Sequence, residues 1–155
     1  MITEQSLRET LKDIFGIDDE HLRPISKNWF LPTVDNSDKV GTWIGYRILN
    51  KEPYARASQT GVIISKPMKV RFRLSFVGPQ SEELADQTIL WEDRLDVTAV
   101  FENHMNAQIN YMSRTAFTYP IRNGGFNDEL CWVVDFSAQT SYDIDTKQVP
   151  WLDRH

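Results

Sequence analysis

The sequence predicts an α+β domain, in which a mostly antiparallel sheet carries one or two helices packed on one face. The order of the periodic segments indicates this class, because helical spacing is followed by strand-type alternation twice along the chain. The size fits one domain, since 155 residues with 41% hydrophobic side chains suffice to bury a core. We expect residues 1–142 to form the domain, with a long loop at about 17–40 and a C-terminal tail at 143–155.

The first expected element is a short amphipathic helix that ends at about residue 15. Thr3 is placed to cap its N-terminus, and Gly16 is placed to end it in a left-handed conformation. The apolar residues of this segment recur at helical spacing: Leu7, Leu11, Ile14 and Phe15. The following stretch, to about residue 40, has no sustained period and contains two prolines, which predicts the long irregular loop.

Three strands are expected next, at residues 42–49, 59–65 and 69–77. The third shows the clearest alternation, and its apolar side chains all fall on one face: Val70, Phe72, Leu74 and Phe76. The opposite face of this strand carries a basic row: Lys69, Arg71 and Arg73. This pattern predicts a half-buried strand with a basic outer face.

The second half of the chain repeats the same order. Helical spacing runs over residues 81–105 and predicts either one long helix or two pieces that break near residues 93–96. Two alternating segments follow at 107–119 and 130–142, and we expect both to be strands. Cys131, the single cysteine, lies among apolar residues and is expected to be a small buried side chain.

Composition excludes several functional classes. The chain has 17 Lys and Arg against 22 Asp and Glu, a net charge of −5, whereas a dedicated nucleic-acid-binding domain usually carries a basic surplus. No apolar run approaches the roughly 20 residues of a membrane-spanning helix, and the first residues do not resemble a signal peptide. We therefore expect a protein made in the cytoplasm with no membrane partner.

The sequence offers little catalytic chemistry. It has no His or Cys pair at metal-binding spacing and no glycine-rich phosphate loop, so we expect no metal, no cofactor and no catalytic residue. A small hydrolase would need His104 as a base for a nucleophile from elsewhere in the chain: Ser81, Ser113 or Cys131. Nothing in the spacing places His104 beside any of them, and we predict that the protein is not an enzyme.

Surface features are more informative. The basic row of the third strand, with Arg47 on a neighbouring strand, indicates either a solvated face or a contact for an acidic partner. Tryptophans outside the core period are typical anchors of protein–protein contacts. The residues expected to form a subunit or partner interface are Trp29, Trp43, Arg47, Arg71, Arg73, Trp151 and Leu152.

Several segments together resemble the tail terminator or neck (tail-completion) proteins of tailed bacteriophages. The opening helix through Phe15 and the strand Gly41–Leu49 match the order of elements in that family. The junction Val70–Ala85 is the most specific part, because a strand ending in Phe-Val-Gly leads directly into a helix with a Glu-Leu-Ala sequence. The closing strand Cys131–Tyr142 also resembles the last strand of the family.

The resemblance implies a structural virion protein that assembles into a ring, usually a hexamer, at the head-proximal end of the tail. Such a ring caps the tail tube and joins it to the head connector. The implied partners are copies of the chain itself, the tail tube protein and a head-side connector protein, with genomic DNA passing through the lumen without specific binding. The alternatives are a small monomeric adaptor or inhibitor that binds a single protein partner, and the hydrolase described above.

Overall fold

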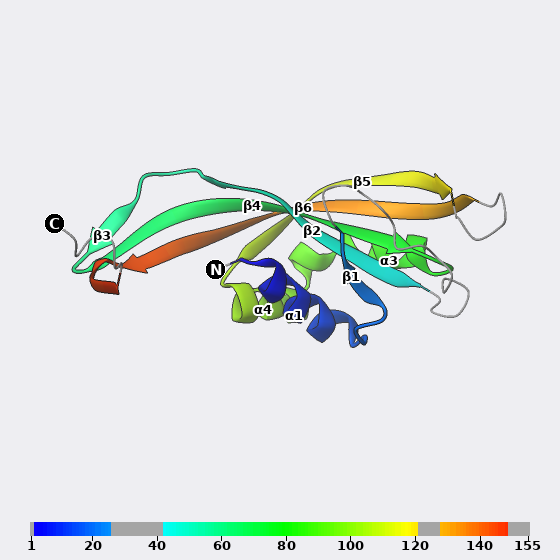
Figure 1. Ribbon diagram of the computed structural model, residues 1–155, viewed down its shortest axis with the longest axis horizontal. Helices are drawn as coiled ribbons and strands as arrows, with labels where there is room; N and C mark the ends of the chain where they lie inside the picture. The colour runs from blue at the N-terminus through cyan, green and yellow to red at the C-terminus, as the bar shows by residue number, and fades with distance from the viewer. Residues whose placement is uncertain (1, 26–41, 121–127, 149–155) are drawn as a thin grey trace.

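A mixed sheet organises the protein, as a computed structural model shows for residues 2–25, 42–120 and 128–148 (Figure 1). The elements in chain order are α1 (Glu4–Phe15), β1 (Leu22–Pro24), β2 (Trp43–Pro53), β3 (Ser58–Thr60), β4 (Ile63–Val77), α3 (Ser81–Thr88), a 3-10 turn η1 (Trp91–Asp93), α4 (Leu95–Met105), β5 (Gln108–Pro120), β6 (Asp128–Asp145) and a second 3-10 turn η2 (Thr146–Gln148). The expected α+β class is confirmed.

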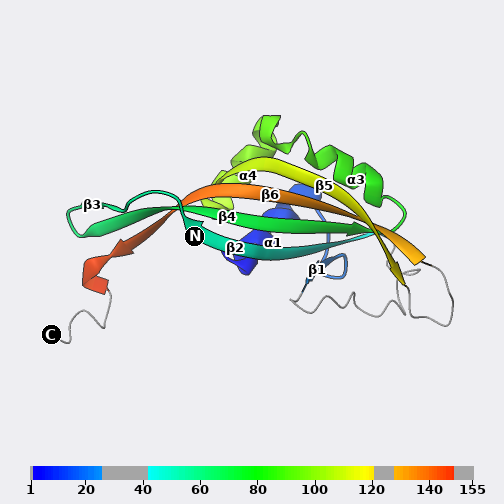
Figure 2. The ribbon, with the colours of Figure 1, turned by 90° about the horizontal axis from the view of Figure 1, so that it is seen from above.

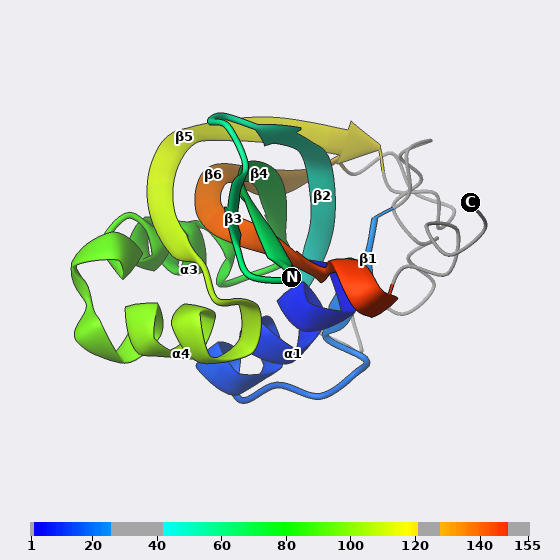
Figure 3. The same ribbon diagram turned by 90° about the vertical axis from the view of Figure 1, so that its left-hand side faces the viewer.

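The sheet has the strand order β1-β2-β4-β6-β5, and β3 pairs with the first part of β4. β1 runs parallel to β2, and all the other pairs are antiparallel. The central pair is long, since β4 and β6 are in register from Ile63 opposite Asp145 to Val77 opposite Cys131. Figure 3 shows α1, α3 and α4 together on one side of the curved sheet.

Helix α1 forms as its sequence predicts. The Thr3 hydroxyl accepts a hydrogen bond from the backbone N–H of Ser6, and the Ser6 hydroxyl accepts one from the N–H of Thr3, which completes a capping box. Gly16 ends the helix at φ +61°, a left-handed conformation that glycine adopts without steric cost. Leu7 and Leu11 are fully buried against the sheet.

Aromatic rings form the centre of the core between the helices and the sheet. Phe72 and Phe136 stack across β4 and β6 with centroids 5.3 Å apart. Trp91 packs on Phe136 at 5.4 Å and on Phe101 at 5.7 Å, so that η1 and α4 are both held against the sheet. Burial of rings of this size is a large part of the stability of a domain.

The segment 81–105 forms two helices rather than one. The break lies between Thr88 and Leu95, a few residues before the expected position, and η1 occupies it. Trp91 points inward there and is 1% exposed, whereas Leu90 and Leu95 on either side are 59% and 87% exposed. The connection between α3 and α4 therefore presents two large apolar side chains to solvent.

The strands extend further than expected. β4 is continuous from Ile63 and includes residues 66–68, which lie between two strands expected from the sequence. β6 continues to Asp145. The first three residues of the expected C-terminal tail thus belong to the sheet, because they pair with residues 63–65 of β4. The expected loop at 17–40 is also interrupted, since β1 lies within it.

The long strands produce a projecting structure that we call the arm, made of β3, residues 63–69 of β4 and residues 139–145 of β6. Figures 1 and 2 show the arm leaving one end of the sheet, and the described α-helices stop at its base. Two of its large apolar side chains, Ile63 and Tyr142, are 46% and 40% exposed. In the arm, therefore, the two faces of the sheet are not both covered.

Candidate functional site

The face of the sheet turned away from the helices, here called the outer face, carries the basic row predicted from the sequence. Arg73 lies on this face between Arg47 of β2 and Asp135 of β6 in one cross-strand row. Its Nε donates to Asp135 Oδ1 at 2.7 Å, and its Nη2 donates to Oδ2 at 3.0 Å. A bidentate pair of this kind fixes both side chains. Arg73 is therefore engaged within the chain.

The remaining basic side chains of the row differ in exposure. Arg71 is exposed and lies opposite Asn50 and Ser137, while Arg47 and Lys69 are half-buried. Like charges directly opposite each other destabilise a sheet, and Asp135 offsets this repulsion between Arg47 and Arg73. The central part of the outer face is thus a basic surface in which Asp135 pairs with Arg73 and Glu52 lies opposite Lys69.

Replacing Asp135 with asparagine is expected to lower the free energy of unfolding by about 1 kcal/mol, because Arg73 would lose a half-buried charged partner and remain opposite Arg47. Urea denaturation of the single variant, of R73Q and of the double variant gives the coupling between the two side chains. We expect the double variant to lose less than the sum of the single losses. Additive losses would contradict an interaction between them.

Trp43 corrects an expectation. It lies on the outer face, as the alternation predicts, but it is 2% exposed and packs in a small cluster with Val77, Cys131 and Val133. The guanidinium of Arg23 lies 5.6 Å from the centroid of its ring, and β1 covers this edge of the sheet. Trp43 therefore does not present its ring to a partner. Trp29, Trp151 and Leu152 lie outside the described residues.

The distribution of charge along the chain is a feature that the sequence prediction missed. Residues 43–77 include Glu52 as their only acid but carry seven bases: Arg47, Lys51, Arg56, Lys66, Lys69, Arg71 and Arg73. Residues 78–106 include Arg94 as their only arginine or lysine but carry seven exposed acids: Glu82, Glu83, Asp86, Glu92, Asp93, Asp96 and Glu102. A count of charge by segment, rather than for the whole chain, would have found this separation.

The acidic segment forms the surface of α3, η1 and the first part of α4. Arg114 of β5 forms an ion pair with Asp86 and lies 3.7 Å from Glu82, and its guanidinium covers the ring of Trp132. Arg94 bonds Asp96 at 2.6 Å and lowers the pKa of that carboxyl. Between these two sets of ion pairs, Glu92 and Asp93 are exposed beside the exposed side chains of Leu90 and Leu95.

An apolar groove lies at the base of the arm, on the side of the sheet that carries the helices. Its volume is about 200 Å³, and it is lined by Ile2, Lys51, Met68, Val70, Thr140, Ser141 and Tyr142. Lys66 is the cross-strand partner of Tyr142, so its side chain rises from the same face beside the groove. On the outer face of the arm, away from the groove, the hydroxyls of Ser65 and Ser141 donate to the carboxylate of Asp143 and lower its pKa. The groove itself is bordered by two lysines.

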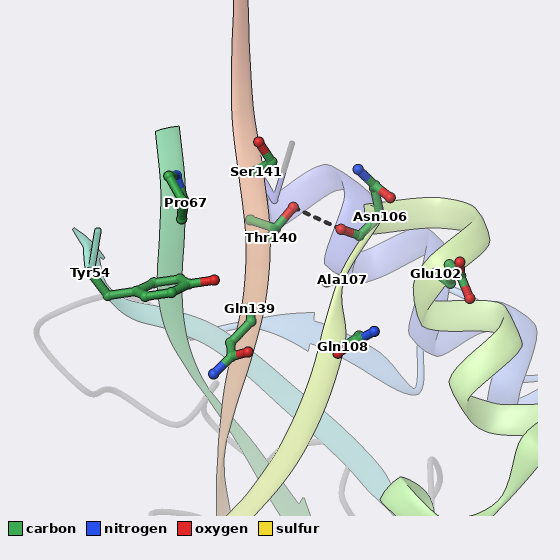
Figure 4. Close-up of a pocket in the computed structure, with 9 residues that line it drawn as sticks. All are labelled: Tyr54, Pro67, Glu102, Asn106, Ala107, Gln108, Gln139, Thr140 and Ser141. Atoms are coloured by element: carbon green, nitrogen blue, oxygen red, sulfur yellow. Dashed lines mark hydrogen bonds between the residues drawn. The ribbon is translucent and has the colours of Figure 1, made fainter. Parts of the chain in front are cut away.

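A second hollow of about 320 Å³ lies where α4 meets β6 (Figure 4). Its lining is mostly neutral and polar, with the amides of Asn106, Gln108 and Gln139 and the ring of Tyr54. The Thr140 hydroxyl donates to the Asn106 carbonyl at 2.8 Å and ties the start of β5 to β6. The lining offers hydrogen bonds and one carboxylate, that of Glu102 on α4, which Figure 4 shows on the far side of Asn106 from the hydroxyls of Thr140 and Ser141.

The residues considered for hydrolysis are not brought together. His104 Nε2 lies 3.0 Å from Asp13 Oδ2, which links α4 to α1. Cys131 is fully buried on the outer face, and Ser81 is buried at the start of α3. Within the described part of the chain, no group of three His, Cys, Asp or Glu side chains could hold a metal ion, and no helix is long and apolar enough to cross a membrane.

No protein-family model matches the chain, and no curated protein matches it in sequence.

Proposed function

We propose that the protein is a ring-forming subunit of the neck of a tailed bacteriophage, a tail terminator that caps the tail tube and joins it to the head-side connector. The proposal is supported by the α+β fold, whose order of elements is the one that the resemblance implies. The observation that carries it is the presence of two different surfaces of opposite charge on one chain: the basic row on β2 and β4, and the acidic surface of α3, η1 and α4.

Two complementary surfaces favour one kind of assembly. A two-fold symmetric dimer could pair the two patches only through one self-complementary interface that contains both, whereas the basic outer face is turned away from the acidic helices. In a head-to-tail arrangement, the basic patch of each copy meets the acidic patch of the next copy, and a suitable rotation closes the ring. The charge distribution therefore supports copies of this chain as the principal partner.

The net charge of the chain is compatible with the passage of DNA through the lumen of such a ring. Six copies of a chain with net charge −5 would carry about −30, and this field repels the phosphates of DNA in the lumen. The genome would pass through without being gripped. The tail tube protein and the connector would bind the two ends of the ring.

The test uses the assembled partner, because a dilute free subunit is compatible with both a ring protein and a monomeric adaptor. Purified protein is mixed with isolated tail tubes and imaged by negative-stain electron microscopy. We expect a ring at one end of each tube, and we expect the protein in purified virions by mass spectrometry. Its absence from virions, or a one-to-one complex with a single host or phage protein, would overturn the proposal in favour of an adaptor.

A further inference from the structure

The apolar groove at the base of the arm and the exposed connection between α3 and α4 have complementary properties. The groove has an apolar lining and is bordered by Lys51 and Lys66. The connection presents Leu90 and Leu95, at 59% and 87% exposure, beside exposed carboxylates. We call Leu90, Glu92, Asp93 and Leu95 the knob.

We propose that the knob of one copy docks into the groove of the next copy, with Leu90 and Leu95 against Met68 and Tyr142, and with Glu92 and Asp93 facing Lys51 and Lys66. This inference rests on the proposed ring and assigns its subunit interface. The pairing is heterologous, as a closed ring requires, because the knob and the groove belong to different surfaces.

A second copy is the occupant that the charges favour. A partner for the groove must combine exposed apolar side chains with acidic ones, and the knob of this chain has both. Leu95 is the most exposed of the large apolar side chains in the described residues, and burial of such a side chain in an apolar groove is favourable. Within one copy the knob stands on the flank of the molecule, while the arm leaves its end (Figure 2). The knob is therefore accessible to the groove of a neighbouring copy.

Charge reversal gives a sharp test. The groove variant is K51E/K66E, and the knob variant is E92K/D93K. Each variant alone would place like charges across every interface, so we expect self-association to fall at least about tenfold. An equimolar mixture is expected to restore rings on tail tubes, because reversed groove meets reversed knob and native groove meets native knob around an alternating ring.

The matched control is E9K/E20K, which makes the same change of charge as the knob variant at two exposed residues outside both charged surfaces. We expect this variant to form rings as the wild type does, and we expect unchanged thermal unfolding for all variants, since these side chains are not buried.

The outcomes separate the two proposals. Rings on tubes that persist in both reversed variants, or a mixture that fails to restore them, would overturn the knob-and-groove interface while leaving the ring intact. Normal self-association of the groove variant with lost binding to tubes would assign the groove to another protein and also overturn the interface. Wild-type protein that forms no ring on tubes and is absent from virions would overturn the proposed function itself.

Discussion

Replacing Trp91 with alanine is expected to lower the free energy of unfolding by about 3–5 kcal/mol, because it removes a large ring from a closely packed core. Trp91 is 1% exposed and lies within 6 Å of three aromatic rings, those of Phe15, Phe101 and Phe136. It is also the residue that fastens η1 to the sheet. The loss should appear as a lower urea midpoint with an unchanged slope.

The control for this variant is Leu95→Ala in the same connection. Leu95 is 87% exposed, so its truncation is expected to change stability by less than about 0.5 kcal/mol. A loss of less than about 1 kcal/mol for Trp91→Ala would contradict the packing described here, since a buried tryptophan cannot be removed at so small a cost. Leu95 belongs to the knob, so this variant is a control for stability and not for self-association.

The faces of the central strands could be predicted from sequence because a strand alternates strictly. The apolar side chains expected on one face of residues 69–77 are all buried against the helices, and the arginines are on the other face. The cap and the end of α1 could be predicted for a similar reason, since Thr3 and Gly16 act on neighbouring backbone groups. Local chemistry decides these features, so a single sequence contains the information.

The missed features depend on contacts between distant residues. The apolar spacing of 81–105 continues through the break, whereas Trp91 within the break packs on Phe136 of the distant strand β6. Ile144 continues the phase of Tyr142, but a single apolar residue between two aspartates does not by itself mark a strand, and residues 143–145 extend β6 because residues 63–65 lie opposite them. The alternation placed Trp43 on the correct face, but nothing local shows that this face is covered at that point.

Replacing Gly45 with valine is expected to destabilise the protein by about 1–3 kcal/mol through overpacking. Gly45 lies in β2 on the outer face, and a Cβ atom placed there would lie 2.7 Å from Cγ1 of Ile25 and closer still to Cδ1. Ile25 is held in place, since its N–H donates to the Tyr46 carbonyl at 2.9 Å and its side chain is 7% exposed. Valine otherwise suits a strand, so the cost measured by urea denaturation is expected to come mainly from the clash.

The double variant G45V/I25A separates this clash from any other role of the glycine. Isoleucine to alanine removes as many carbon atoms as glycine to valine adds, and the removed atoms are the ones that the new side chain would meet. I25A alone is expected to cost about 2–4 kcal/mol by leaving a cavity over β2. The double variant conserves volume and is expected to lie within about 1.5 kcal/mol of the wild type, more stable than I25A. A double variant less stable than I25A would show that Gly45 is required for a reason other than the close approach of Ile25, such as the packing of Trp43, whose Cζ3 lies 3.4 Å from the same position.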